Sequence, residues 1–231
     1  MKNKAGKYFA VNFVLLLMIV CIYLAANAAM LQNVFAQVGQ APIYKGQKNT
    51  ITLVISAEAD FENAVLTGRY AKEKGLVLTI GFTAEQMQAK PEEIKKLSAM
   101  GHEVILQGQI DTGHATPEEI RTALNREIQA YTQLFSKAPQ YYLPYRFQAT
   151  TLIKKACKEQ ALKVVLFSQD SRAVVYKKAD AFAQTLFSQI SKGDFIYLDH
   201  AVLSQDVLER LHREMEGSGY KNQNMTQALI D

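Results

Sequence analysis

The chain has 231 residues, of which 48% are apolar and 21% are charged, a composition typical of one globular domain or two small ones. Two cysteines are too few for a disulfide scaffold. The net charge is +4, but residues 1–31 carry three lysines and no acidic residue. The rest of the chain has 23 basic and 22 acidic side chains, so a basic surface for nucleic acid is not expected.

An apolar segment follows the first lysines. It is uninterrupted over residues 13–26 and, with two asparagines tolerated, covers residues 8–31. About 20 apolar residues cross a bilayer as a helix, and a basic flank stays in the cytoplasm. We therefore expect residues 1–31 to be a signal anchor with a single pass through the cell membrane, which places the remaining chain outside the cytoplasm.

Two other interpretations of this segment stay open. Small residues at 26–29 and 34–36 suit cleavage of a signal peptide, which would give a secreted protein. A buried core helix is the third interpretation. Residues 32–49 contain Gln, Gly, Pro and Lys without periodicity, which predicts a linker before a domain at residues 50–231.

Short β-type runs alternate with helical patterns from residue 50 onward. Strands are predicted at residues 50–56, 76–82, 103–107, 141–143, 163–168 and 194–198. Helices, several of them marked by capping residues, prolines or final glycines, are predicted at residues 61–74, 91–100, 117–135, 152–161, 182–190 and 205–216. This alternation predicts an α/β fold with a parallel sheet covered by helices, either a barrel or an open doubly wound sheet.

In such folds the functional site lies at the carboxyl ends of the strands. Glu58 follows the first strand and could serve as a base or a metal ligand, whereas Asp60 is better explained as the cap of the next helix. His200 ends a strand and is the most plausible functional histidine, while His102 starts a strand and suits a structural role. No serine-hydrolase, nucleotide or dinucleotide motif occurs, so a nucleotide is not an expected partner.

The order of segments over residues 50–231 resembles the polysaccharide deacetylase family, whose NodB homology domain is a distorted (β/α) barrel. The similar stretches are LVLTIGFTAEQMQAKPEEIKKLSAMGHEVILQGQ at residues 76–109, YYLPY at 141–145, LKVVLFSQDS at 162–171, GDFIYLDHA at 193–201 and GYKNQNMTQALI at 219–230. The resemblance implies this barrel, preceded by one N-terminal hydrophobic helix.

The family uses a divalent metal of the zinc type to remove acetyl groups from N-acetylated sugars. One Asp and two His hold the metal, and an adjacent Asp acts as the base. In this chain the Asp-Asp pair falls on residues 56–57 or 57–58, and the two histidines fall on Gln107 and Asp111. If a metal is bound, the resemblance implies Glu58, Gln107 and Asp111 as its ligands, but an amide is a weak ligand.

The resemblance also implies residues that contact substrate. The arginine of the family's Arg-Pro-Pro-Tyr segment falls on Tyr142, and Tyr145 and Arg146 belong to the same aromatic stretch. Asp170 matches the aspartate of an Asp-Ser pair. We take these four as candidate substrate-binding residues, with the alternative that one or two of the rings belong to the core, because YYL also has the pattern of a strand.

The family's late catalytic histidine falls on Asp199, and His200 is displaced by one position, which on a strand turns a side chain to the other face. Glu58, Asp199 and His200 are the remaining candidates for catalysis. With both metal-binding histidines replaced, water activation by a metal lacks support. We expect no cofactor and a catalytically degenerate, membrane-tethered domain that acts on or binds cell-envelope glycan. The alternatives are an active deacetylase with an altered ligand set and an envelope domain that binds another protein.

Overall fold

The computed structural model describes residues 13–20, 41–46, 49–174 and 179–230. The chain separates into two units, Met1–Gly39 and Gln40–Asp231. In the first unit, residues 13–20 are helical with exposed apolar side chains. Most of the predicted anchor at residues 8–31 lies outside the described residues, and within these no helix is both long and apolar enough to span a bilayer.

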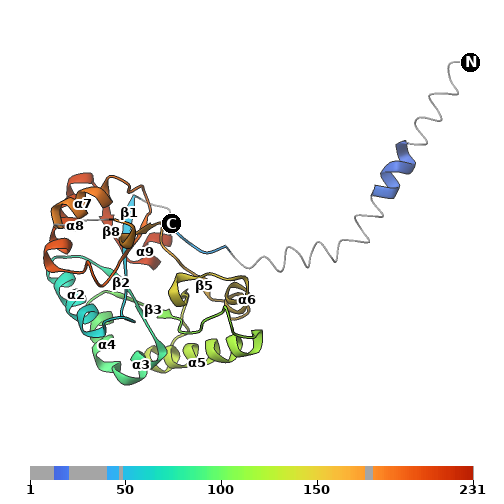
Figure 1. Ribbon diagram of the computed structural model, residues 1–231, viewed down its shortest axis with the longest axis horizontal. Helices are drawn as coiled ribbons and strands as arrows, with labels where there is room; N and C mark the ends of the chain where they lie inside the picture. The colour runs from blue at the N-terminus through green and yellow to red at the C-terminus, as the bar shows by residue number, and fades with distance from the viewer. Residues whose placement is uncertain (1–12, 21–40, 47–48, 175–178, 231) are drawn as a thin grey trace, which may run out of the picture. The chain divides into compact units, whose positions relative to one another are not determined.

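The second unit is built on a parallel sheet in the order β5-β4-β3-β2-β1-β7-β6, with β8 beside β1. Figure 1 shows the helices arranged around this sheet, and the predicted distorted barrel is confirmed in the form of a curled, open half-barrel. The strands are β1 (Thr50–Ser56), β2 (Leu78–Phe82), β3 (Glu103–Gln107), β4 (Tyr141–Leu143), β5 (Lys163–Val164), β6 (Gln169–Asp170), β7 (Phe195–Leu198) and β8 (Lys221–Asn222).

Most helices lie where the sequence predicts them. They are α2 (Phe61–Glu73), α3 (Ala84–Ala89), α4 (Pro91–Ala99), α5 (Pro117–Phe135), α6 (Thr151–Glu159), α7 (Ala179–Phe187), α8 (Gln205–Ser218) and α9 (Met225–Leu229). Asp60 caps α2 by accepting a 3.0 Å hydrogen bond from the Asn63 backbone, as expected. The short helix α3, which Thr83 and Gln86 close with a capping box, was not predicted.

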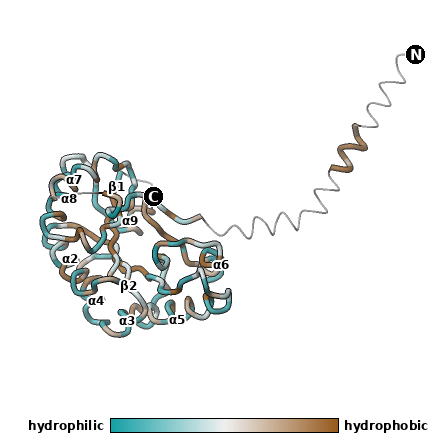
Figure 2. Tube along the Cα trace, viewed as in Figure 1, coloured by the Kyte–Doolittle hydropathy of each residue, from teal (hydrophilic) through white to brown (hydrophobic). Residues whose placement is uncertain are grey.

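The strands separate two hydrophobic clusters because successive side chains point to opposite faces. Strand β1 is buried along its whole length. Leu53 and Ile55 belong to the large cluster that the surrounding helices share, whereas Val54 belongs to a smaller cluster with Leu143 and Phe195. In Figure 2, β1 and β2 are largely brown because most of their residues are hydrophobic. Along the outer helices, hydrophilic and hydrophobic residues alternate. The sheet is thus packed on both of its faces.

Residues 41–46 correct the predicted linker at residues 32–49, because they form part of the domain. Ile43 pairs with Val165, next to β5, and Lys45 pairs with Asp194, next to β7. The Lys45 ammonium also lies 2.7 Å from the buried carboxylate of Asp194. We call residues 41–46 the strap. Its pairs are long-range and its own sequence has no period, so local patterns do not reveal it.

The predicted strand at residues 163–168 also differs in the structure. Only Lys163–Val164 pairs with β4. Val165 pairs with the strap, and the chain then crosses to β6 beside β7. The apolar run at residues 163–168 therefore pairs with β4 at its start and leads to β6 beside β7 at its end.

Candidate functional site

The parallel register brings the carboxyl ends of the strands to one edge of the half-barrel. Ser56 at the end of β1 lies beside Gly81 of β2, and Gln107 at the end of β3 lies beside Leu143 of β4. We call this edge the carboxyl face, where parallel α/β folds carry their sites. It comprises residues 56–58, 107–111, 145–147, 167–172 and 197–200.

Three polar residues of this face form a closed hydrogen-bonded ring. The Ser56 hydroxyl donates to Gln107 Oε1 at 2.7 Å, and Gln107 Nε2 donates to Glu58 Oε2 at 2.7 Å. The Glu58 backbone N–H then donates to Ser56 Oγ at 3.2 Å. A Cβ on Gly81 would lie only 2.7 Å from Gln107 Oε1, so the glycine leaves room for the amide. Ser56 and Gln107 are buried and Glu58 is exposed, so only the carboxylate opens to solvent.

The ring does not fit a zinc-type ion. Such an ion needs three or four histidine, cysteine or carboxylate ligands, and the ring supplies one carboxylate, one hydroxyl and one amide. The oxygen of the Gln107 amide is already used by Ser56. Asp111 is exposed and accepts a 2.9 Å bond from Gly113 in its own loop. Over the described part of the chain, no three His, Cys, Asp or Glu side chains are grouped to hold a metal.

The Glu58 carboxyl group is a weaker acid than an ordinary glutamate. Partial burial raises the pKa of its carboxyl group. The hydrogen bond from Gln107 and the positive charge of Arg146 act in the opposite direction. The three side chains thus influence one another across the ends of β1, β3 and β4.

An aromatic cluster occupies the other side of the carboxyl face. The rings of Phe147, Phe167 and Tyr197 lie with their centroids 4.6–4.8 Å apart. The Arg172 guanidinium lies 4.9 Å from the Phe147 centroid and 5.3 Å from that of Tyr197. Asp170 binds the same guanidinium through both carboxylate oxygens, at 3.0 and 2.6 Å. The predicted substrate-binding Asp170 is therefore paired with Arg172, which also covers the aromatic cluster.

Asp199 and His200 lie together at the end of β7. Asp199 Oδ1 accepts a 3.1 Å bond from the Ala201 backbone and lies 3.4 Å from His200 Nδ1. The Asp199 backbone N–H donates to the Ser171 hydroxyl at 2.8 Å. The side chain of His200 is 46% exposed, so it stands at the rim of the face. These contacts join β6 and β7, whereas the ring joins β1 and β3.

Tyr142 corrects the sequence prediction. It is completely buried, and its hydroxyl donates to Glu127 of α5 at 3.0 Å. The prediction that Tyr142 binds substrate is therefore wrong, because its side chain lies beneath the loop at residues 108–111 and against α5, where it is closed off from solvent. The physical reason is the alternation of β4, which turns neighbouring residues to opposite sides.

The short turn that follows β4, Tyr145–Phe147, stands on the face. Tyr145 is half-buried, and the exposed Arg146 guanidinium lies 5.0 Å from the Tyr145 ring centroid. Arg146 and Phe147 both have positive φ, 49° and 59°, a conformation that costs about 1–2 kcal/mol for each non-glycine residue. Packing holds this loop in a strained shape, which is common at functional sites.

Several residues of the face were not predicted from the sequence. Ser56 was expected only as a replacement for a family aspartate, and Arg172, Phe167 and Tyr197 were not expected to form part of a site. Phe167 and Tyr197 come from separate apolar runs of the sequence, where an aromatic side chain has the pattern of a core residue. Cation–aromatic contact between elements has no local sequence signal.

His102 is structural, as its position predicted. Its Nδ1 accepts a 3.0 Å bond from the Leu78 backbone, and its Nε2 lies 2.8 Å from the Gly68 carbonyl, to which it donates. Burial lowers the pKa of the His102 ring, which keeps it neutral.

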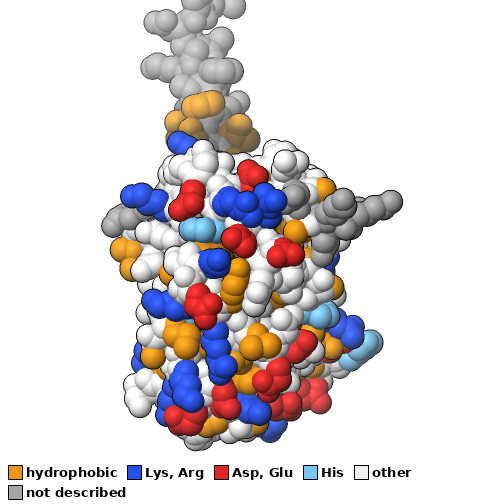
Figure 3. All heavy atoms as spheres, turned by 90° about the vertical axis from the view of Figure 1, so that its left-hand side faces the viewer, with side chains coloured by type: hydrophobic (Ala, Val, Ile, Leu, Met, Phe, Trp, Pro, Cys, Tyr) orange, Lys and Arg blue, Asp and Glu red, His pale blue; other side chains and the backbone are white. Residues whose placement is uncertain are grey.

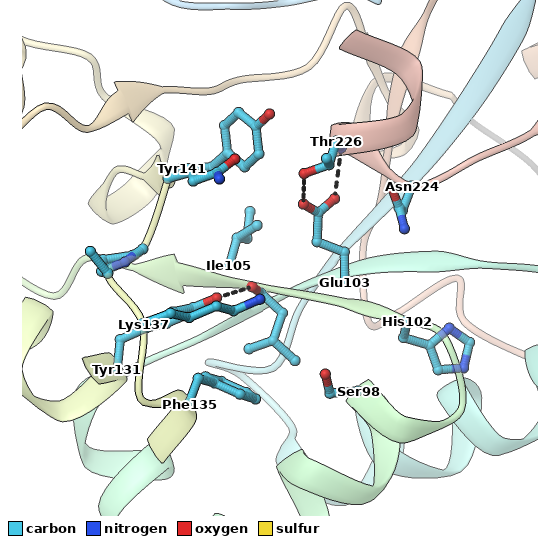
Figure 4. A pocket seen from close by; sticks show the side chains of 14 residues that line it. Ser98, His102, Glu103, Ile105, Tyr131, Phe135, Lys137, Tyr141, Asn224 and Thr226 are labelled. Atoms are coloured by element: carbon cyan, nitrogen blue, oxygen red, sulfur yellow. Dashed lines mark hydrogen bonds between the residues drawn. The ribbon is translucent and has the colours of Figure 1, made fainter. Parts of the chain in front are cut away.

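A cavity of about 290 Å³ lies at the opposite, amino end of β3 and β4. Figure 4 shows the Glu103 carboxylate turned to Thr226, with Tyr141 and Tyr131 on other sides of the cavity. Glu103 accepts hydrogen bonds from the Thr226 backbone and hydroxyl, so it fastens the start of α9. This cavity is far from the strand ends where the chemistry of parallel folds occurs.

The surface that α2, α4, α7 and α8 present is mixed in charge. Figure 3 shows Lys and Arg side chains interspersed with Asp and Glu, and with apolar side chains between them. This pattern differs from the continuous basic surface that nucleic acid requires.

The fold has counterparts of known structure, although no protein-family model and no curated protein matches the sequence. A pseudoenzyme of carbohydrate esterase family 4 from Bacillus anthracis matches with a TM-score of 0.74 and 16% identity, over 82% of this chain and 69% of that one. A peptidoglycan N-acetylglucosamine deacetylase matches with a TM-score of 0.71 and 18% identity, over 81% and 92%.

The chitin deacetylase of the fungal pathogen Colletotrichum lindemuthianum has a TM-score of 0.70 and 14% identity, over 83% of this chain and 92% of that one. Identities this low establish the fold alone. The chain therefore has the fold of the polysaccharide deacetylases of carbohydrate esterase family 4.

Proposed function

We propose that this protein binds glycan through its carboxyl face without hydrolysing it. The observation that carries the proposal is the hydrogen-bonded ring of Ser56, Gln107 and Glu58 at the position where the resembling family holds its metal. Each member of the ring bonds another member, and a neutral amide takes the place of an imidazole. Metal-activated water, the nucleophile of the family, has no set of ligands here.

The binding half of the proposal rests on the composition of the face. It offers an aromatic cluster, two guanidinium groups and several carboxylates around the strand ends. Aromatic rings pack on the apolar faces of sugars, while charged and polar groups bond their hydroxyls. The matched structures include a peptidoglycan deacetylase and a chitin deacetylase, so N-acetylglucosamine polymers are the first ligands to test.

The loss of chemistry has a parallel among the matched structures. The Bacillus anthracis protein is a pseudoenzyme, and a mutant of it with restored enzymatic activity has a TM-score of 0.69 with this chain. We infer that this chain keeps the scaffold in a similar way and has replaced the metal site by the ring.

The test measures binding and turnover on the same full-length protein. N-acetylglucosamine oligomers and soluble peptidoglycan fragments are titrated by calorimetry, and acetate release is followed with and without added zinc. We expect saturable binding and no acetate. Turnover that depends on zinc would refute the non-catalytic function, and absence of binding to both ligands would favour a protein partner instead.

A matched pair of variants locates the site. Arg146→Ala removes an exposed guanidinium from the carboxyl face, and Lys137→Ala removes an exposed ammonium from the cavity at the other end of the strands. We expect the first variant to weaken glycan binding about tenfold, the loss typical of an interfacial arginine. The second variant should bind like the wild type, and equal effects of both would contradict the proposed location.

We further propose that residues 8–31 tether the protein to the membrane with the domain outside the cytoplasm. The length of the apolar segment and the lysines before it support this arrangement. Fractionation of cells, protease treatment of spheroplasts and N-terminal sequencing test it. A protein found in the medium that begins after residue 26 would instead identify a cleaved signal peptide.

A further inference from the structure

Glu127 is a buried carboxyl group that the proposed glycan site does not use directly. It lies on α5 and is only 5% exposed. Its Oε1 accepts a 2.9 Å hydrogen bond from the backbone N–H of Gln109, and its Oε2 accepts a 3.0 Å bond from the Tyr142 hydroxyl. Gln109 comes two residues after Gln107 of the ring. Glu127 therefore holds the chain just where β3 passes into the carboxyl face.

The loop at residues 108–111 is fitted closely around this contact. A Cβ on Gly108 would lie 1.9 Å from the Tyr142 hydroxyl oxygen. The glycine thus lets Tyr142 reach Glu127 beneath the loop. The Gly108 backbone also donates a 2.9 Å bond to the Leu143 carbonyl. Glu127 and Tyr142 together support the loop from its inner side.

A cavity of about 240 Å³ lies beside Glu127. It is formed by α3, α5 and the loop, and its walls include Glu85, Gln88, Gln109, Ile110 and Arg126. A space of this size holds several water molecules. Protons can therefore reach the carboxyl group although it is almost fully buried.

We propose that Glu127 is a positioning residue of the carboxyl face: its carboxylate holds the Gln109 backbone and so fixes the loop at residues 108–111, and protonation of Glu127 releases this loop. The effect on glycan affinity rests on the proposed function. The effect on the loop does not.

Of the buried ionisable groups Glu127, Tyr142 and Cys157, only Glu127 changes its charge near neutral pH. Burial raises its pKa to about 7, against the hydrogen bonds from Gln109 and Tyr142, which lower it. Tyr142 of β4 and Cys157 of α6 are neutral at this pH, because burial raises the pKa of the phenol well above its usual value and that of the thiol to about 12. The other ionisable residues that line the cavity are Arg126 on α5 and Glu85 on α3.

The two states of Glu127 differ in how they bond the loop. A carboxylate accepts both hydrogen bonds, and bonds to a charged acceptor are about twice as strong as neutral ones. A protonated acid must donate its own hydrogen, so the Tyr142 hydroxyl has to turn and the bond from Gln109 loses its charged acceptor. The variant Glu127→Gln keeps nearly the shape of the glutamate side chain and is neutral at every pH.

The first experiment reads the loop without any ligand. The amide signal of Gln109 is followed by NMR in the full-length protein from about pH 5.5 to about pH 8.5, a range in which an unperturbed glutamate does not titrate. We expect a shift with a midpoint near pH 7 in the wild type and none in Glu127→Gln. Tyr142→Phe removes a bond that lowers the pKa, so its midpoint should move to higher pH. If Glu127 had only a structural role, the midpoint of the Gln109 signal would be the same in Tyr142→Phe as in the wild type.

The control is Glu118→Gln, which neutralises an exposed carboxyl group at the start of the same helix. In this variant the Gln109 amide signal should shift with the same midpoint as in the wild type. A Gln109 signal that stays constant over this range in the wild type, or one that still titrates in Glu127→Gln, would overturn the proposal.

The second experiment measures the affinity for N-acetylglucosamine oligomers at about pH 5.5 and about pH 8.5. We expect the wild type to bind about fivefold more tightly at the higher pH, and Glu127→Gln to change less than about twofold, because only the wild type gains the charge-assisted bond. If no oligomer binds at either pH, the proposed function fails while the Gln109 titration still decides the role of Glu127. Equal pH dependence in both proteins would show that Glu127 does not act on the site.

Discussion

The buried hydroxyl of Ser56 lies 2.7 Å from the amide oxygen of Gln107 and donates a hydrogen bond to it. This bond joins the ends of β1 and β3, which are separated by β2 in the sheet. A neutral bond of this kind contributes about 1 kcal/mol, whereas a buried amide left without a partner costs about 1–3 kcal/mol. The carboxyl face is therefore held together by hydrogen bonds that need no ion.

Restoring the family's ligand types should create a metal site. The variant Gln107→His, Asp111→His keeps the Glu58 carboxylate and places two imidazoles at the other positions that the resemblance assigns to the ligands. We expect it to retain about one zinc per chain in elemental analysis, because these are ligands that zinc prefers. Gln107→His alone should retain none. A wild-type protein that already holds one zinc per chain would contradict the description of the ring.

The strap should contribute measurably to stability through Lys45. In Lys45→Met the ammonium beside the buried Asp194 carboxylate is lost, and we expect the free energy of unfolding to fall by about 2 kcal/mol at pH 7. Ser191 and Ser168 still bond the carboxylate, which limits the loss. Urea unfolding measures this change, and Lys95→Met, which removes an exposed ion pair, should change stability by less than about 1 kcal/mol.

Acid should weaken the effect of Lys45. Burial raises the pKa of Asp194, but the ammonium and the hydrogen bonds outweigh it, so the pKa lies below its usual value. The stabilisation from a lowered carboxyl pKa is present above the unfolded value, near 4, and disappears as the pH falls through the folded value. The difference between wild type and Lys45→Met should therefore shrink below about pH 4. A constant difference down to pH 2 would argue against the ion pair as its cause.

Arg146→Gly should separate stability from binding. Residue 146 has φ = 49°, which glycine adopts without the strain of a side chain. After the greater chain entropy of unfolded glycine is counted, we expect a gain of about 1 kcal/mol in the free energy of unfolding. The same variant should lose glycan affinity, since it lacks the guanidinium. A variant that is less stable and binds normally would contradict both expectations, and thermal melting with calorimetry measures them.

The raised pKa of Glu127 should also make the free energy of unfolding depend on pH. Its folded pKa of about 7 lies above the unfolded value. The folded state therefore binds the proton more tightly, and this stabilisation is full below about pH 4 and is lost as the pH rises through 7. We expect the wild type to lose about 2–3 kcal/mol relative to Glu127→Gln between pH 5 and pH 8 in urea unfolding. Parallel pH profiles of the two proteins would show that Glu127 is not perturbed.

Much of the fold follows from the sequence because its signals are local. Apolar runs and helical periods locate most strands and long helices, and Asp60 and Thr116 cap α2 and α5 where the spacing predicts. The alternation of these elements indicates a parallel sheet whose strands end at a common edge. The replacement of imidazoles by Gln107 and Asp111 is likewise visible in the residue types themselves.

The site required the folded chain because its contacts join residues far apart in sequence. Strand alternation on the short β4 takes Tyr142 beneath α5 to Glu127, whereas Tyr145 and Arg146 follow the strand in a short turn on the face. The strap belongs to the domain only through its backbone pairs with Val165 and Asp194.

By itself, then, the sequence determined the kinds of elements, their order and the residue types at the strand ends, since these depend on neighbours along the chain. Only the tertiary structure decided which side chains meet. The ring of Ser56, Gln107 and Glu58 spans about 50 positions, and Arg172 joins Phe147 to Tyr197 from a third element. Hydrogen bonds and ring contacts act over only a few ångströms, and folding alone brings such distant residues within that range.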